Sequence, residues 1–171
     1  MSLRLRAQLA AAWGIVFAAP HVYWATGRKE GLGTALSDRV VRDAGLAMAL
    51  SCAGIALFCL CGAAVALATV REWPPRWRTG ARRALVGLTW FGAVLLILRS
   101  VDIFVEFSLT LTGVWSLPAG DWANFLHLAR WFMFVYLPWF TLGAIAWTRL
   151  AWRYTRAGQH ASLRAEPATA G

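Results

Sequence analysis

The sequence predicts an all-α, polytopic membrane protein, a bundle of four transmembrane helices with both termini in the cytoplasm. Composition is the first observation that supports this class. Hydrophobic residues make up 59% of the 171 residues and charged residues only 15%, with a mean hydropathy of +0.54. Globular proteins are usually less apolar and more charged. A soluble domain of this length could not bury so much apolar surface, so we expect a multi-pass protein of the cell membrane in contact with lipids.

Four apolar stretches are the second observation, and each is long enough to cross a hydrocarbon core, which takes about 20 helical residues. Each should be helical, because only a helix satisfies its own backbone in lipid. The expected helices cover residues 7–25, 44–70, 84–107 and 125–147. They form one domain, residues 1–157, and the polar, alanine-rich residues 158–171 are expected to be a disordered cytoplasmic tail.

The first stretch resembles a secretory signal, because Arg4 and Arg6 precede an apolar run. Cleavage after Ala19 would leave Pro20 at the new N-terminus, and the apolar character continues to Ala25. We therefore expect an uncleaved helix.

Basic residues in the short flanks predict the orientation. Positive flanks stay in the cytoplasm, and eleven arginines lie on one side of the predicted spans against four basic residues on the other. The cytoplasmic set is Arg4, Arg6, Arg71, Arg76, Arg78, Arg82, Arg83, Arg149, Arg153, Arg156 and Arg164, and the outer set is Arg28, Lys29, Arg39 and Arg42.

Ionisable residues inside the spans are the most informative feature, because a charge at the bilayer centre costs about 2.5 kcal/mol or more and usually faces the bundle interior. The alternating direction of the helices brings those of the first, third and fourth helices to a similar depth. We expect a polar pocket in the outer leaflet. Its expected residues are His21, Tyr23, Trp24, Arg99, Asp102, Glu106, His127, Arg130 and Tyr136.

A purely structural role competes with the pocket. Arg99, Asp102 and Glu106 are spaced i, i+3, i+7 and so share one helix face. Arg99 could extend outward and pair with Asp102 as a clamp that stabilises the bundle. Pro138 is expected to kink the fourth helix and to free a carbonyl one turn earlier, near Phe134.

Several classes of protein are not favoured. The basic residues flank apolar stretches instead of forming a nucleic-acid-binding surface. Cys52, Cys59 and Cys61 lack the Cys-x-x-Cys spacing of a redox or zinc site. No metal site and no resident cofactor are predicted.

The segment His21-Val22-Tyr23-Trp24-Ala25-Thr26-Gly27 resembles a motif of small bacterial four-helix integral membrane proteins, the domain-of-unknown-function 3995 family. In that family the first helix ends in His-x-Tyr-Trp-Ala-x-Gly-Gly, an arginine lies late in the third helix, as Arg99 does, and a Tyr-x-Pro step resembles Tyr136-Leu137-Pro138. Arg28 replaces the second glycine, and Trp131 and Phe132 replace an expected acidic residue. The resemblance implies a four-helix bundle and no assigned reaction.

Three functions remain open. The first is an undefined, non-enzymatic membrane protein whose outer-leaflet pocket binds a lipophilic small molecule. The second is an intramembrane isomerase or cyclase acting on a lipid or isoprenoid, with Asp102 or Glu106 as acid and His21 or His127 as proton partner. The third is a haem protein with His21 and His127 as axial ligands. A homo-oligomer is compatible with each of them.

Overall fold

The computed structural model describes residues 2–117 and 122–165, with side chains as far as residue 157. All regular elements within these residues are helices, as the sequence predicts. The long helices are α1 (Leu3–Ala25), α3 (Leu46–Ala68), α4 (Pro75–Leu111) and the nearly continuous run of α5 (Trp122–Trp131), the π-helix η2 (Phe132–Tyr136) and α6 (Leu137–Ala165). The short helices η1 (Leu32–Thr34) and α2 (Asp38–Arg42) lie between α1 and α3.

Three of the predicted apolar stretches, 7–25, 84–107 and 125–147, lie within long helical segments, and the fourth, 44–70, extends two residues beyond each end of α3. Three of the long segments, α3, α4 and the run from Trp122 to Ala157, are long and apolar enough to cross a membrane. The last helix continues to Ala165, beyond the boundary at residue 157 where the sequence predicts a disordered tail. Alanine, leucine and arginine, which are strong helix formers, are frequent there. Residues 166–171 lie outside the described residues.

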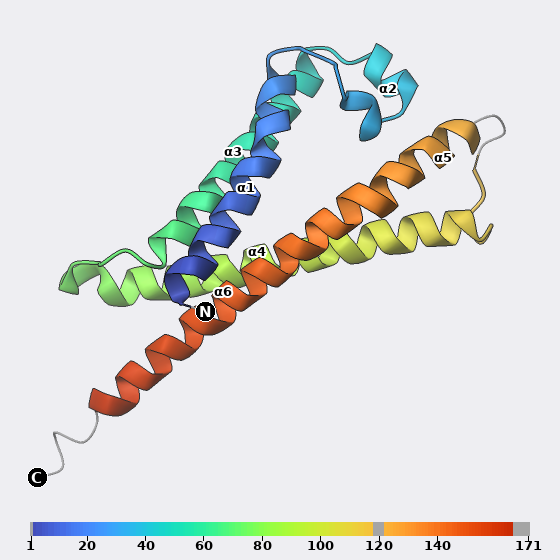
Figure 1. Cartoon of the computed structure of the whole chain (residues 1–171). Coiled ribbons are helices and arrows are strands. Elements are labelled where there is room, and N and C mark those ends of the chain that lie inside the picture. The colour runs from blue at the N-terminus through green and yellow to red at the C-terminus, as the bar shows by residue number, and fades with distance from the viewer. Residues whose placement is uncertain (1, 118–121, 166–171) are drawn as a thin grey trace, which may run out of the picture.

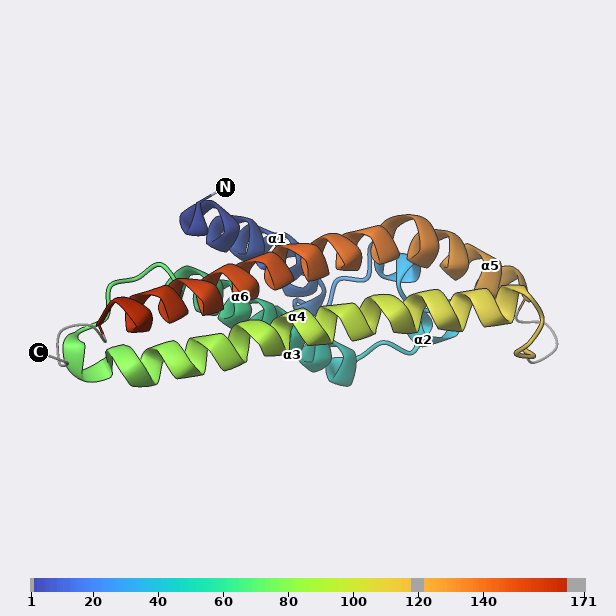
Figure 2. The same cartoon turned by 90° about the horizontal axis from the view of Figure 1, so that it is seen from below.

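The helices form two arms, which converge at one end of the molecule and diverge at the other (Figure 1). Helices α1 and α3 pack along each other in one arm, and α4 packs along α6 in the other. The view from below shows α4 and α6 as two long, neighbouring rods (Figure 2). Contacts between the arms are made chiefly by α1 with α6.

Small residues allow α1 and α3 to approach closely. Ala7, Ala10 and Ala63 are at most 4% exposed. A Cβ atom added to Gly14 would lie 3.0 Å from the carbonyl oxygen of Cys59. Close backbone packing of this kind is typical of helix pairs in membranes, where van der Waals contact replaces the hydrophobic effect as a driving force.

Two tryptophans fill the region where the arms meet, and each faces a glycine. A Cβ atom on Gly92 of α4 would lie 2.7 Å from the ring of Trp147 of α6, which is 5% exposed. Likewise, a Cβ atom on Gly143 of α6 would lie 2.5 Å from the ring of Trp13 of α1. The bare helix surfaces at these glycines therefore provide the space that the indole rings occupy.

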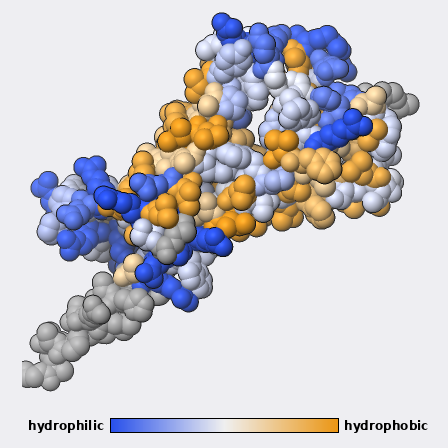
Figure 3. Space-filling model, viewed as in Figure 1, coloured by the Kyte–Doolittle hydropathy of each residue, from blue (hydrophilic) through white to orange (hydrophobic). Residues whose placement is uncertain are grey.

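Hydrogen bonds connect the predicted cytoplasmic flanks at the converging end. Arg6 donates to the carbonyl of Arg149 at 3.1 Å, and Arg82 donates to the carbonyl of Thr155 at 3.4 Å. Figure 3 shows hydrophilic surface at both ends of the molecule and mostly hydrophobic surface between them. The start of α1, the start of α4 and the end of α6 therefore share one polar end.

A π-helical turn directly precedes Pro138, in the region where the sequence predicts a kink. Residues Phe132–Tyr136 form this turn just before the proline, and the N–H of Leu137 bonds to the carbonyl of Phe132. Proline has no N–H to donate to the preceding turn. The helix therefore adjusts its hydrogen-bond register one turn earlier, a common solution at prolines in apolar helices.

Candidate functional site

The two arms enclose a cleft of about 910 Å³. Its walls come from α1 and α3 on one side and from α4, η2 and α6 on the other, and residues in and beside η1 line one end. The space-filling view shows the surface hollowed between the diverging arms (Figure 3). Volumes of 300–1,000 Å³ are typical of ligand-binding pockets. The cleft is therefore large enough for a lipid-sized occupant.

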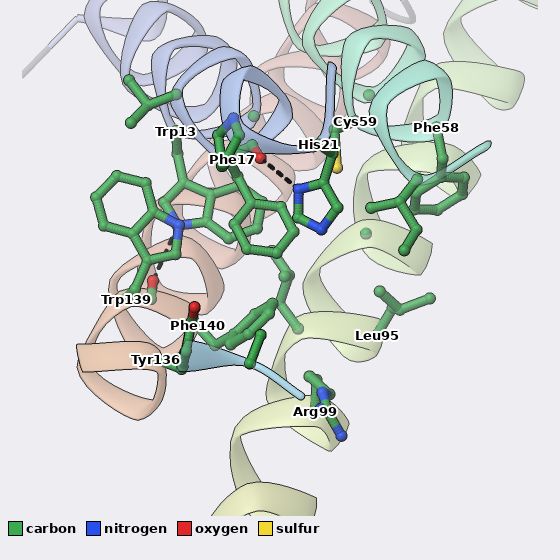
Figure 4. Close-up of a pocket in the computed structure, with 18 of the residues that line it drawn as sticks. Trp13, Phe17, His21, Phe58, Cys59, Leu95, Arg99, Tyr136, Trp139 and Phe140 are labelled. Atoms are coloured by element: carbon green, nitrogen blue, oxygen red, sulfur yellow. Dashed lines mark hydrogen bonds between the residues drawn. The ribbon is translucent and has the colours of Figure 1, made fainter. Parts of the chain in front are cut away.

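Eleven of the residues that line the cleft are aromatic. On α1, Trp13 and Phe17 stack with ring centroids 5.4 Å apart, and the indole N–H of Trp13 donates to the carbonyl of Trp139 at 2.9 Å. Phe17 also meets Phe140 edge-on at 5.1 Å. Figure 4 shows these rings gathered around one space. The lining aromatics are Trp13, Phe17, Tyr23, Trp24, Phe58, Phe91, Phe132, Tyr136, Trp139, Phe140 and Trp147.

His21 is one helical turn beyond Phe17 and adds an imidazole ring to this wall. Its Nδ1 lies 2.9 Å from the carbonyl oxygen of Phe17. Its ring also packs at 4.7 Å from the Phe17 ring and edge-on to Trp24 at 5.3 Å. In Figure 4 the second ring nitrogen points into the cleft, away from the α1 backbone. The imidazole is therefore held in one orientation.

The loop after α1 makes several hydrogen bonds at the end of the cleft nearest η1. Thr34 of η1 and Tyr136 of η2 share a hydroxyl–hydroxyl bond of 2.8 Å. The Tyr23 hydroxyl donates to a carboxylate oxygen of Glu30 at 2.8 Å. The backbone N–H of Glu30 itself and then the Tyr23 hydroxyl hold the pKa of this carboxyl below its ordinary value. The loop is thus bonded to residues of both arms.

Arg99 contributes the guanidinium group of the cleft. It forms an ion pair with Asp102 one turn along α4. Its guanidinium carbon also lies 5.9 Å from the centre of the Phe140 ring, within the range of a cation–π contact. The side chains of Arg99 and Asp102 are 42% and 57% exposed. The pairing of Arg99 with Asp102 follows the clamp that the sequence suggests, while Arg99 also lines the cleft.

The structure brings five of the nine predicted pocket residues to the cleft lining. These are His21, Tyr23, Trp24, Arg99 and Tyr136. The other four, Asp102, Glu106, His127 and Arg130, are exposed and are not among the lining residues.

The rotation per residue around α4 explains why Asp102, for example, lies outside the cleft. The buried face of α4 passes through Leu96, Ile103 and Phe107. Asp102 is about 100° around the helix from Ile103, because each residue of an α-helix turns by that angle. Similar depth in the membrane therefore does not place two residues on the same face of the bundle.

The cleft also contains residues that sequence analysis did not identify. Trp13 and Phe17 precede His21 at i−8 and i−4, so the three rings share one face of α1. This spacing is a sequence signal that could have identified the aromatic wall. Glu30 and Thr34 carry no such signal, because their positions depend on the fold of the loop.

Within the described residues, the side chains that could bind a metal ion or a haem do not come together in one site. No group of three His, Cys, Asp or Glu side chains there is close enough to hold a metal ion. His21 lines the cleft while His127 does not, so the two imidazoles do not face a common space.

Comparison with known proteins gives one match. A family model described as "Protein of unknown function (DUF3995)" matches residues 14–147. Searches of curated proteins and of solved structures found no match. The matched region includes most of the four long helical segments and all five cleft residues named above. The chain therefore belongs to the DUF3995 family of proteins of unknown function.

Proposed function

We propose that this chain is a four-span integral membrane protein that binds the apolar part of a lipophilic small molecule in the cleft between its two arms. The observation that carries the proposal is the cleft itself, about 910 Å³ in volume and lined mainly by aromatic and aliphatic side chains. Along α1 its lining extends from Trp13 to Trp24, which is about 16 Å at the rise of an α-helix. An extended hydrocarbon chain fits such a space.

The proposed orientation places the converging end in the cytoplasm and the loop with α2 outside. The hydrogen bonds of Arg6 and Arg82 to α6 support this orientation, because they gather three arginine-rich flanks at one end. The cleft then opens within the outer leaflet, because its lining reaches Glu30 and Thr34 in the outer loop. A molecule dissolved in the membrane could enter sideways between the arms.

Binding is favoured over the other functions that the sequence leaves open. The isomerase or cyclase would need Asp102 or Glu106 beside a substrate, and the haem protein would need His127 opposite His21. None of these three residues lines the cleft. Binding of an apolar chain requires only the surface that the cleft presents.

Two tryptophan variants at neighbouring positions of α4 test the proposal. Leu95 lines the cleft and is 38% exposed, while Val94 beside it is 49% exposed and outside the lining. We expect Leu95→Trp to fill the cleft and to lose lipid that co-purifies with the protein in native mass spectra. Val94→Trp is the control for adding an indole to α4 and should keep that lipid. Equal lipid retention in both variants would exclude the cleft as the binding site.

Reporter fusions test the orientation separately. Alkaline phosphatase, which is active only outside the cytoplasm, should be active when joined after Gly33 and inactive when joined after Gly80. The opposite pattern would place the cleft in the inner leaflet without affecting the case for binding.

A further inference from the structure

We infer that the cleft selects a neutral long-chain alcohol, and that the hydroxyl group of this alcohol donates a hydrogen bond to Nε2 of His21. The inference rests on the proposed function, since it concerns the polar end of the same occupant. It assigns a specificity-determining role to one atom in the cleft.

The first step is the tautomer of His21. The partner of Nδ1 is the carbonyl oxygen of Phe17 at 2.9 Å. A carbonyl oxygen can only accept a hydrogen bond, so the proton of the imidazole is on Nδ1. Within the described residues His21 forms no ion pair with a carboxylate that would stabilise a second proton. The Nε2 atom of the neutral ring is therefore an acceptor.

The second step is the direction of that acceptor. Nε2 has no hydrogen-bond partner within the described part of the chain, and in Figure 4 it points into the cleft. Packing against Phe17 and Trp24 prevents the ring from turning away. An acceptor in an apolar space is favourable only when a donor reaches it. A hydroxyl at the end of an apolar chain supplies such a donor.

The third step is the charge of the cleft, which opposes an anionic occupant. Arg99 and Glu30 are the two charged lining residues that the structure describes, and their charges cancel. Arg99 is also paired with Asp102, and Glu30 accepts from Tyr23. A carboxylate or phosphate would therefore meet no excess positive charge in the cleft. An alcohol head group needs none.

Three probes with the same sixteen-carbon chain separate these properties. Hexadecan-1-ol can donate a hydrogen bond, its methyl ether can only accept one, and hexadecanoate carries a negative charge. We expect native mass spectrometry titrations to give an apparent Kd for the alcohol about two- to tenfold lower than for the ether, the factor that one net hydrogen bond supplies. Hexadecanoate should bind no better than the ether.

The His21→Phe variant keeps a ring against Phe17 and removes Nε2, so it should bind the alcohol and the ether equally. His127→Phe is the matched control, because His127 is exposed and outside the cleft lining. It should keep the wild-type preference. If His21→Phe does not fold, ¹⁵N spectra of wild-type protein labelled in histidine replace it. The Nε2 resonance of His21 should then shift with the alcohol and not with the ether.

The outcomes distinguish the two proposals. Equal binding of all three probes to the wild-type protein would overturn the inference and leave the proposed function intact. Preference for hexadecanoate would overturn it in favour of an anion site at Arg99. If no probe binds, both the inference and the proposed function fail.

Discussion

Substitution of Gly92 by alanine tests whether the two arms depend on the tryptophan–glycine contact. The Cβ atom of the new alanine would lie 2.7 Å from Trp147, a separation that requires the ring or the helix to move. The indole has little room to do so. It is 5% exposed, so neighbouring groups enclose it, and a Cβ atom added to Gly62 of α3 would lie 3.5 Å from a different edge of the ring.

The size of the effect follows from two opposing terms. Alanine in place of glycine in a helix contributes about 1 kcal/mol of stability through its higher helix propensity. Overpacking in a closely packed region costs about 1–3 kcal/mol. We therefore expect Gly92→Ala to lower the free energy of unfolding by about 0–2 kcal/mol. The steric term is isolated by comparison with a glycine on the same helix that has free space.

Gly87 is that control, because its added Cβ atom would have no neighbour within 4 Å apart from its own stretch of helix. Gly87→Ala should raise the free energy of unfolding by about 1 kcal/mol, so the two variants should differ by about 1–3 kcal/mol. Reversible unfolding by SDS in mixed micelles, followed by the helical circular dichroism signal, measures this difference. Gly62→Ala should be tolerated, since 3.5 Å is ordinary contact. Equal stability of the Gly92 and Gly87 variants would refute the reasoning.

Three further predictions concern the polar contacts. Tyr136→Phe removes the 2.8 Å bond to Thr34 and should cost about 0.5–1.5 kcal/mol, with faster hydrogen exchange in η1; Thr34→Val should match it, and a double variant that loses twice as much would contradict a shared bond. Arg99→Gln and Asp102→Asn each leave an unpaired charge in an apolar helix. The stability lost by the double variant should therefore be smaller than the summed losses of the two single variants, by about 1 kcal/mol or more. Additive losses would show that the pair does not interact. The lowered pKa of Glu30 means that its contacts stabilise the fold above the ordinary value of 4.5 and lose this effect as the pH falls through the lower, folded-state pKa. The stability difference between wild type and Glu30→Gln should therefore disappear in acid, and a constant difference from pH 7 to pH 3 would contradict it.

The helices could be predicted from the sequence and their packing could not. Hydropathy alone locates the four long apolar helices, because a membrane would select helices of a limited range of lengths. The fit of Trp147 against Gly92 depends on which faces of α4 and α6 meet. Nothing in the spacing of either residue indicates the other, so the two-armed shape is visible only in the structure.

The candidate site was predictable in part for a related reason. His21 and Arg99 are conspicuous because polar groups are rare in apolar spans, and both line the cleft. The predicted orientation places Glu106 and His127 at a similar depth, but depth does not determine which way their side chains point. Thr34 reaches Tyr136 only because the loop after α1 folds back over the arms.

The π-helical turn at Phe132–Tyr136 has a consequence for how the last span tolerates change in length. A π turn is equivalent to one extra residue inserted into an α-helix, so α5 is rotated by about 100° relative to an uninterrupted continuation of α6. Deletion of a single residue here, such as Met133, would restore α-helical bonding and turn the α5 surface that stacks on Phe107 away from α4. The rotation of α5 relative to α6 therefore depends on the number of residues between α5 and Pro138.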